Sequence, residues 1–303
     1  MNDRRKLLAT GWLRDYPDIR DYTLKTNSVS TRMKQLGVKA SISEMAKRIG
    51  LNKQPAKGLP VSVDLRPFCP PVEDQDDIGS CTAHAGVGLI EYYERRAFGK
   101  HIDASRLFLY KVTRNLLHWT GDTGAFLRTT MKAMAIFGVP PEEYWPYHTP
   151  DFDVEPPAFC YSFGQNYQAM QYFRLDGDVQ GEELLDRIKL LLAFGLPSMF
   201  GFSVFSSIWE TFDEGLIPFP GPAEQIIGGH AIVAVGYDNK KEITNPATSL
   251  KTKGALLIRN SWGLGFGGDG YGWLPYDYVK SGLAVDWWTL LKNEWVDLNI
   301  FTL

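Results

Sequence analysis

The feature of this sequence that most limits its fold is a change in hydrophobic period near residue 165. Before that point, apolar residues recur at helical spacing in residues 81–98, 104–117 and 124–137. After one more helical run at 182–194, the apolar residues form short runs separated by Gly, Pro and Asn, at 198–204, 231–235, 255–258 and 270–274. Helices followed by strands predict an α+β fold with two lobes, and a functional site is expected in the cleft between the lobes.

The chain divides into an N-terminal extension, residues 1–58, and a main domain, residues 59–303. Within the main domain we expect a mainly helical lobe at about 59–165, a mainly strand-rich lobe at about 166–280 and a C-terminal tail at 281–303. The segment 53–60 contains two prolines and a glycine and is the best linker candidate. In the extension, the sequence Ser41 to Glu44 is typical of a capping box that opens a short helix, which Gly50 ends.

Composition excludes several classes of protein. The chain has 303 residues, of which 44% are hydrophobic and 22% charged, the values of a soluble globular protein. No apolar run approaches the roughly 18 residues of a membrane helix, so no membrane span is expected. The apolar run at residues 7–9 is too short for a secretory signal, which predicts a cytoplasmic protein or one exported by a non-classical route. The net charge of −3 predicts no nucleic-acid partner.

Charge is distributed unevenly along the chain. Residues 1–58 contain 13 Lys and Arg against five Asp and Glu, a net charge of +8, and the other 245 residues carry 19 against 30, a net charge of −11. A basic leader on an acidic body can be an arm for nucleic acid or membranes, or it can dock on its own body. The opposed charges favour docking, because they attract over about 8 Å at physiological ionic strength.

Among the three cysteines, Cys81 is the candidate nucleophile. It begins the helical run at 81–98, and the free backbone N–H groups at a helix N-terminus favour the thiolate, which is the reactive form. Cys69 lies in a Phe-Cys-Pro-Pro sequence and Cys160 follows two prolines, so neither uses a helix end. We expect both to be buried filler or to form a mutual disulfide.

A thiolate nucleophile needs a base that later returns a proton, and His230 is the best of the five histidines. It follows Gly228 and Gly229, which permit close approach, and precedes the apolar run at 231–235. His84 lies one helical turn beyond Cys81 and is an alternative, but no orienting group is near it in sequence. The remaining three, in polar or loop-like contexts, are expected at the surface: His101, His118 and His148.

Asn260 completes a set of residues for acyl transfer. It lies thirty residues after His230, in the sequence Asn-Ser-Trp-Gly, and its side chain can accept a hydrogen bond from one imidazole nitrogen and so orient the ring. Cys81, His230 and Asn260 therefore predict nucleophilic catalysis at a carbonyl. Neither a metal nor a cofactor is expected.

Four blocks of sequence, in order from about Val61 to Tyr271, resemble the papain family of cysteine peptidases. Gln75 to Cys81 is similar to the family's block of Gln, five residues and Cys, and Val63 to Arg66 resembles the start of its mature enzyme. Gly229 to Ala231 and Asn260 to Gly263 are similar to its His and Asn blocks. Three departures, at Ile78, Thr82 and Phe266, remove no catalytic atom. The resemblance is to a bacterial-looking type without the usual disulfides and long helical propeptide.

The resemblance implies a papain-like fold, with a helical lobe, a strand-rich, β-barrel-like lobe and the active site between them. Cys81 would attack the scissile carbonyl, His230 would protonate the leaving amine and Asn260 would hold His230. The Gln75 side chain and the Cys81 backbone N–H would form the oxyanion hole, and Trp262 would cover the bond between His230 and Asn260. The partners would be peptide or protein substrates.

Specificity in this family depends mainly on the pocket for P2, the residue two before the cut on its N-terminal side. The local matches assign substrate binding to Gly124, Phe126, Leu127, Gly201, Gly228, Ala231 and Trp262. The pocket walls among them carry no charge, so a large apolar side chain is expected at P2. Two other functions stay open: a catalytically silent peptide-binding homologue, and an acyl-transferring relative similar to a transglutaminase.

The extension at residues 1–58 has two possible roles. As an intramolecular inhibitor it would cover the cleft and make the chain a zymogen. As a structural tail it would complete the fold, with Trp12, Tyr16 and Tyr22 packed permanently against a lobe.

Overall fold

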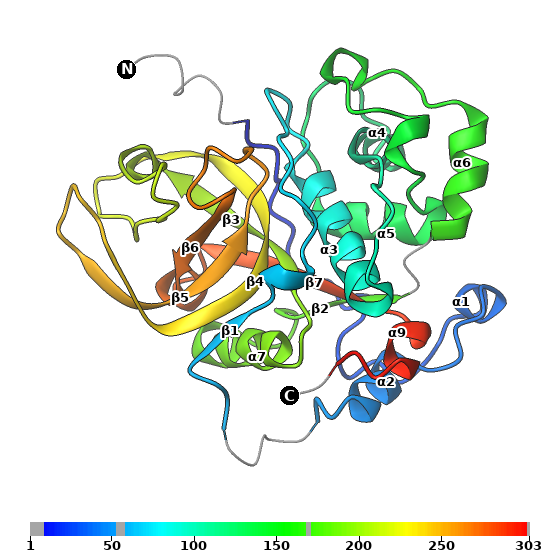
Figure 1. Ribbon diagram of the computed structural model, residues 1–303, viewed down its shortest axis with the longest axis horizontal. Coiled ribbons are helices and arrows are strands. Elements are labelled where there is room, and N and C mark those ends of the chain that lie inside the picture. The colour runs from blue at the N-terminus through cyan, green and yellow to red at the C-terminus, as the bar shows by residue number, and fades with distance from the viewer. Residues whose placement is uncertain (1–8, 53–57, 168–170, 302–303) are drawn as a thin grey trace.

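The computed structural model describes residues 9–52, 58–167 and 171–301 (Figure 1). Most of the expected linker, residues 53–57, lies outside the described residues. None of the described helices is long and apolar enough to cross a membrane. No group of three or more His, Cys, Asp or Glu in the described part of the chain is placed to hold a metal ion.

The helices follow the sequence pattern closely in the first half of the chain. Expected and observed bounds agree for α3, Cys81–Phe98, which ends at Gly99 with a positive φ of 70°, a conformation that glycine adopts without strain. The described helices are α1 Thr31–Gln35, α2 Ile42–Arg48, α3 Cys81–Phe98, α4 Arg106–Leu116, α5 Leu127–Phe137, α6 Ala158–Gly164, α7 Gly181–Ala193, α8 Tyr276–Lys280 and α9 Asn293–Asp297. Helix α5 begins three residues later than expected, because Ala125 pairs as extended backbone with Trp12.

The strands form one antiparallel sheet, in the order β2-β7-β3-β4-β5-β6, with β1 paired to β4. They are β1 Ser62–Asp64, β2 Gln171–Arg174, β3 Ser198–Phe205, β4 Ile226–Thr244, β5 Lys251–Arg259, β6 Tyr271–Pro275 and β7 Ala284–Leu291. The α+β class and the two lobes are confirmed, but the sheet is open, not barrel-like. Strands β4 and β5 also continue through part of the polar segment between His230 and Asn260.

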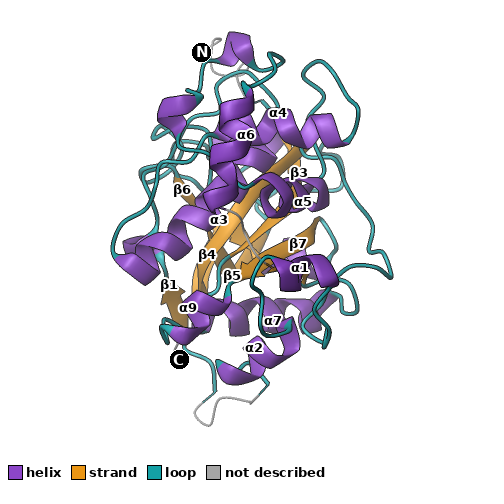
Figure 2. Ribbon diagram, turned by 90° about the vertical axis from the view of Figure 1, so that its right-hand side faces the viewer, coloured by secondary structure: helices purple, strands orange, loops and turns teal. Residues whose placement is uncertain are grey.

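The two lobes lie side by side, with the sheet in one and helices α3 to α6 in the other (Figure 1). Turned by 90°, these helices lie in front of the strands (Figure 2). Helix α3 lies on the side of the helical lobe that faces the sheet, because it packs on α4 and α5 and also on strands β3 and β4. Its first residue is thereby held beside the sheet.

Residues 284–291, which the sequence analysis placed in a C-terminal tail, form strand β7. This strand pairs with both β2 and β3 and carries some of the largest buried side chains, including Trp287 and Trp288. Its apolar residues run without alternation because both faces of the strand are covered, and that pattern resembles a short helix as much as a strand.

The N-terminal extension contributes to the core of the molecule. In α2, the side chains of Ile42 and Met45 are fully buried, and Ser41 forms the expected capping box with Glu44. The backbone N–H of Arg174 in β2 donates to the Tyr22 carbonyl oxygen over 2.7 Å. The first described residues run between the two lobes (Figure 1). The extension is therefore joined to the fold at several places.

We predict that Ser41→Ala lowers the free energy of unfolding by about 1 kcal/mol, because the Glu44 N–H at the start of α2 loses its acceptor. Chemical denaturation of the full chain measures the change. Ser43→Ala, in the same helix but outside the cap, is the control and should change stability by less. Equal effects of the two substitutions would contradict a role of the cap in global stability.

Candidate active site

The turn before α3 fixes the position of Cys81. The Gly79 N–H donates to the Asp122 carboxylate over 2.9 Å, and the Ser80 hydroxyl bonds to the Tyr147 hydroxyl over 2.7 Å. Cys81 follows as the first residue of the helix, and its side chain is fully buried. The helix N-terminus and these hydrogen bonds place the thiol at the interface between the two lobes.

His230 lies in β4 and is oriented as expected. Its Nε2 is 2.8 Å from the Asn260 Oδ1, and the Trp262 ring stacks on the imidazole with a centroid distance of 4.2 Å and an interplanar angle of 17°. The other ring nitrogen, Nδ1, is buried and has no hydrogen-bond partner among the described residues. This nitrogen is therefore available to a reacting group.

The packing of α3 on β4 brings the thiol to the histidine strand. The backbone N–H of Ala231, the residue after His230, is one of the groups that bond to the Cys81 thiol and lower its pKa. Trp262 stacks on the imidazole, and His230 and Asn260 are both buried. The structure thus gathers the expected nucleophile, base and orienting residue at one place.

Gln75 lies at the same place, and a residue that the sequence analysis did not single out holds it there. The Ser261 hydroxyl donates to the Gln75 Oε1 over 2.6 Å, so the amide Nε2 faces the cleft, where it donates to the Ala9 carbonyl oxygen over 3.1 Å. The Ser261 backbone N–H also donates to the Asn260 Oδ1 over 2.8 Å. Ser261 therefore orients both Gln75 and Asn260. Its position in the sequence between Asn260 and Trp262 was the one signal that could have identified it.

The thiol and the imidazole are both in an environment that favours their neutral forms. Burial raises the pKa of the Cys81 thiol to about 11, although nearby backbone N–H groups oppose the shift. Burial lowers the pKa of His230 to about 4, and the bond to Asn260 opposes that shift. Burial therefore opposes an ionised pair of thiolate and imidazolium in the described structure.

The other histidine and cysteines considered for the site, His84, Cys69 and Cys160, have structural roles. The His84 Nδ1 lies 3.2 Å from the Ser80 carbonyl oxygen, and its ring packs edge-on against Tyr147. Burial lowers the pKa of His84 to about 3. Cys69 and Cys160 are buried free thiols, so the expectation of buried filler is confirmed and the mutual disulfide is not formed.

The cleft at Cys81 is occupied by residues 9–13 of the same chain. The Trp12 N–H donates to the Gly229 carbonyl oxygen and the Leu13 N–H to the Ala125 carbonyl oxygen, each over 3.1 Å. The Ala125 N–H donates to the Gly11 carbonyl oxygen over 2.8 Å. The segment is thus bonded to both walls of the cleft, one from each lobe.

Three of the expected substrate-binding glycines contact this segment directly. A methyl group added at Gly201 would lie 1.9 Å from the Trp12 ring, and one added at Gly228 would lie 2.3 Å from the Thr10 hydroxyl oxygen. Gly124 is packed equally closely on the backbone of Gly11. The absence of side chains here leaves the space that the segment fills.

The other expected substrate-binding residues border the same region. Leu127 and Ala231 are buried, Phe126 is half-buried against Trp119, and the Trp262 indole N–H donates to the Ala9 carbonyl oxygen over 3.3 Å.

A carboxylate that the sequence analysis did not single out lies beside the glycines that contact Trp12. The Trp12 indole N–H donates over 3.0 Å to the carboxylate of Asp286, which is fully buried in β7. The sequence analysis missed Asp286 because it treated this strand as part of a tail.

Charged groups on both sides anchor the segment that follows Trp12. Arg128 pairs with Asp15 and, over 2.8 Å, with Asp21, so acids of the extension bind a cation of the body. Pairs of the expected sign also occur, Lys25 with Asp178 and Arg48 with Asp297, but their cations are more exposed. Exposed pairs contribute little, so the net charge of +8 is a poor guide to what holds the extension.

The family model for papain family cysteine proteases matches residues 59–287. An uncharacterized peptidase C1-like protein of Acanthamoeba polyphaga mimivirus is 33% identical over 224 residues, which are 72% of this chain and 68% of that protein. Cathepsin K of Gallus gallus is 26% identical over 70% of this chain and 58% of its own length. The chain therefore belongs to the papain family and is a cysteine peptidase, a hydrolase.

Solved structures agree with this assignment. Xylellain, a cysteine protease from Xylella fastidiosa, is 32% identical and aligns with a TM-score of 0.70 over 93% of this chain and 95% of its own. A cysteine protease of Carica candamarcensis, solved in complex with E-64, is 21% identical and shows the shared fold, with a TM-score of 0.56 over 78% of this chain and all of its own.

We predict that alkylation of Cys81 by iodoacetamide in the full chain is slow at pH 7. Because burial raises the thiol pKa to about 11, the reactive thiolate increases as the pH rises toward that value, about tenfold for each pH unit. Peptide mapping by mass spectrometry separates Cys81 from the other two thiols. Fast alkylation that is unchanged between pH 5 and 8 would instead mean that an ionised pair exists in the resting chain.

Proposed function

We propose that the chain hydrolyses peptide bonds through a thioester formed on Cys81. The Cys81 sulfur attacks the scissile carbonyl carbon, and His230 carries the thiol proton to the nitrogen of the leaving amine. Water then attacks the thioester carbonyl carbon and gives a proton to His230. The bond to sulfur breaks, the acid leaves, and His230 returns the proton to the Cys81 sulfur. The observation that carries this proposal is the His230 ring, which is bonded to Asn260 and stacked on Trp262, with an Nδ1 that has no hydrogen-bond partner among the described residues.

Charge that develops on the carbonyl oxygen needs donors that are already in place. The Gln75 Nε2 now donates to a peptide carbonyl oxygen, that of Ala9, and the bond from Ser261 fixes the direction of this amide. We assign Gln75 and the Cys81 backbone N–H to the oxyanion hole, where each donor contributes about 2.7 to 4 kcal/mol to the transition state. The glycine-walled pocket that holds Trp12 would take a large apolar side chain at P2.

The proposal predicts that E-64 labels the protein on Cys81 and that Cys81→Ala abolishes both labelling and peptide turnover. Loss of the nucleophile removes several orders of magnitude in rate, whereas a small side chain at a helix start costs little stability. Intact mass gives the label, and a fluorogenic peptide gives turnover. Cys160→Ala is the matched control and should retain both. Turnover by Cys81→Ala would exclude the mechanism, and the absence of both in the parent chain, after opening as described below, would favour a silent homologue.

Residues 9–24 are proposed to keep the peptidase closed until they are displaced. They occupy the cleft by hydrogen bonds to Gly229 and Ala125 and are anchored by Arg128. A substrate cannot form the same bonds until these are broken.

The polarity of the segment would prevent its own cleavage. The amine that His230 protonates lies on the C-terminal side of the cut, so that part of a substrate passes His230 and Trp262, and the part before the cut reaches the pocket at Gly201. The bound segment runs the other way, with Ala9 at Trp262 and Trp12 on Gly201. Its pairing with Ala125 is parallel.

We predict that Trp12→Ala in the full chain raises kcat/KM for small peptides by about tenfold or more. The substitution removes an indole that is almost fully buried, and such losses cost about 3 to 5 kcal/mol, here at the expense of the closed state. Tyr16→Ala is the control, because Tyr16 lies in the same segment but is 70% exposed. A less active or insoluble Trp12→Ala chain would favour a purely structural role for the extension.

A further inference from the structure

Residues 75–81 carry both donors of the proposed oxyanion hole, one at each end. Gln75 supplies its side-chain Nε2 and Cys81 its backbone N–H. Residues 76–80 belong to no helix or strand, and Asp76 has a φ of 51°, in the left-handed region. Regular secondary structure therefore does not fix the distance between the two donors, and contacts with other parts of the chain must do so.

Tyr147 contacts this segment near both of its ends. Its hydroxyl donates to the Gln75 carbonyl oxygen over 2.9 Å, and its oxygen lies 2.7 Å from the hydroxyl oxygen of Ser80, the residue before Cys81. A hydroxyl has one proton and a carbonyl oxygen can only accept, so the Ser80 hydroxyl donates to Tyr147. One phenol thereby joins the residue that carries the first donor to the residue that precedes the second.

The hydroxyl of Ser80 is not used in the way that its position favours. Ser80 is the N-cap residue of α3, where a serine usually accepts from an N–H of the first helical turn. Its side chain accepts no such bond, and the N–H of Thr82 is one of the groups that bond to the Cys81 thiol and lower its pKa. The bond to Tyr147 thus takes the place of a helix cap and leaves this N–H to the nucleophile.

Tyr147 is itself held firmly by the helical lobe. Its backbone N–H donates to the Glu142 carboxylate, which pairs with Arg106 over 3.1 Å. The Arg106 guanidinium lies 5.8 Å from the centroid of the Tyr147 ring, and the His84 ring packs on that ring edge-on. Burial raises the pKa of Tyr147, so its hydroxyl keeps the proton that it donates. The phenol is therefore a fixed point from which residues 75–81 are held.

The backbone of Gln75 is bonded to both lobes. Its N–H donates over 2.8 Å to the carbonyl oxygen of Ser261, which follows β5, and its carbonyl oxygen accepts from Tyr147 in the helical lobe. Without the Tyr147 hydroxyl, this backbone would be bonded on the Ser261 side alone. The place of the Gln75 Nε2 relative to the Cys81 N–H would then no longer be fixed by the lobe that carries α3.

We propose that Tyr147 is a positioning residue that holds the two oxyanion donors at the separation that the transition state requires. This inference rests on the proposed peptidase function and deepens it. Tyr147 acts through Gln75 and Cys81, not on the substrate. Donors stabilise an oxyanion only from about 2.7 to 3.1 Å, and a misplacement of about 1 Å can cost about a hundredfold in rate.

The test compares Tyr147→Phe with its parent, the full chain with Trp12→Ala. Phenylalanine keeps the ring on Arg106 and removes only the hydroxyl. We expect kcat for a fluorogenic peptide to fall about tenfold or more and KM to stay within about twofold, because the donors act on the transition state.

Chemical denaturation of the same two proteins separates positioning from stability. The Ser80 hydroxyl, once free, can cap α3, so the denaturation midpoint should shift little. A lower midpoint with an unchanged kcat per folded enzyme would assign Tyr147 to stability alone and overturn the proposal.

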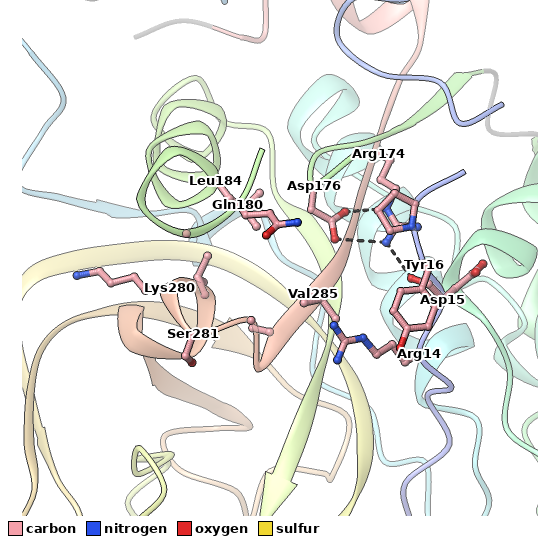
Figure 3. Close-up of a pocket in the computed structure, with 15 residues that line it drawn as sticks. Arg14, Asp15, Tyr16, Arg174, Asp176, Gln180, Leu184, Lys280, Ser281 and Val285 are labelled. Carbon is pink, nitrogen blue, oxygen red and sulfur yellow. Dashed lines mark hydrogen bonds and ion pairs between the residues drawn. The ribbon is translucent and has the colours of Figure 1, made fainter. Parts of the chain in front are cut away.

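Two other tyrosines serve as matched controls. Tyr161→Phe removes a hydroxyl from α6 in the same lobe, where it bonds to Glu155 and, over 3.3 Å, to Asn115. Tyr16 lies at a cavity between the extension and the strand-rich lobe, and no residue of the segment 75–81 lines that cavity (Figure 3). Both substitutions to Phe should leave kcat unchanged, and an equal loss in either would overturn the assignment to Tyr147.

A double-mutant cycle with Gln75→Ala tests whether Tyr147 acts through the donors. Residues that act through one another do not have additive effects. We expect Tyr147→Phe to lower kcat by about threefold or less once the Gln75 side chain is absent. The same tenfold loss in both backgrounds would overturn the proposal.

The parent chain separates failure of this inference from failure of the proposed function. Turnover by the parent that Tyr147→Phe leaves unchanged would reject the positioning role and retain the peptidase. A parent without turnover would reject both, because no oxyanion would then form.

Discussion

The contact between the indole of Trp12 and the bare backbone of Gly201 fixes the N-terminal segment between the two lobes. It requires a glycine on β3, a second glycine in β4 and the acceptor on β7, so three neighbouring strands contribute to one pocket. The same contact fixes where the polar backbone of residues 9–13 lies, and thereby covers the thiol and the imidazole. Burial raises the pKa of the thiol and lowers the pKa of the imidazole.

The candidate catalytic residues could be predicted from the sequence because their signals are local. Cys81 follows from a helix start with a clear period and a glycine stop, and His230 from two glycines before a buried strand. Gln75 and Asn260 could be assigned roles from their spacing in the sequence to Cys81 and His230. Ser261 was overlooked because a serine between two assigned residues looks like a connector until its hydroxyl is seen to hold Gln75.

The rest of the site could not be predicted, because it depends on pairs far apart in the chain. Trp12 and Asp286 are 274 positions apart, and neither lies in a motif. The direction of Asp286 depends on a bulge, which the sequence pattern of β7 does not reveal. Net charge misled in a similar way: five acids among 18 charged residues of the extension were a minority in the count, yet Asp15 and Asp21 form its pairs with Arg128.

Under the proposed function, Trp12 and a substrate side chain would compete for one pocket, and Trp12 is covalently tethered to it. The tether gives the internal indole an effective concentration of about millimolar order, which no dilution of the enzyme reduces. A substitution that improves the fit of an indole in the pocket would therefore strengthen the binding of the substrate and of Trp12 together. The apparent affinity for substrate would then gain little. The preference for a substrate and the stability of the closed state can change independently only through contacts that one of the two competitors makes alone. The ion pair between Arg128 and Asp21 of the extension is such a contact. Natural variation that tunes how readily the enzyme opens is thus expected at those anchors and not in the pocket.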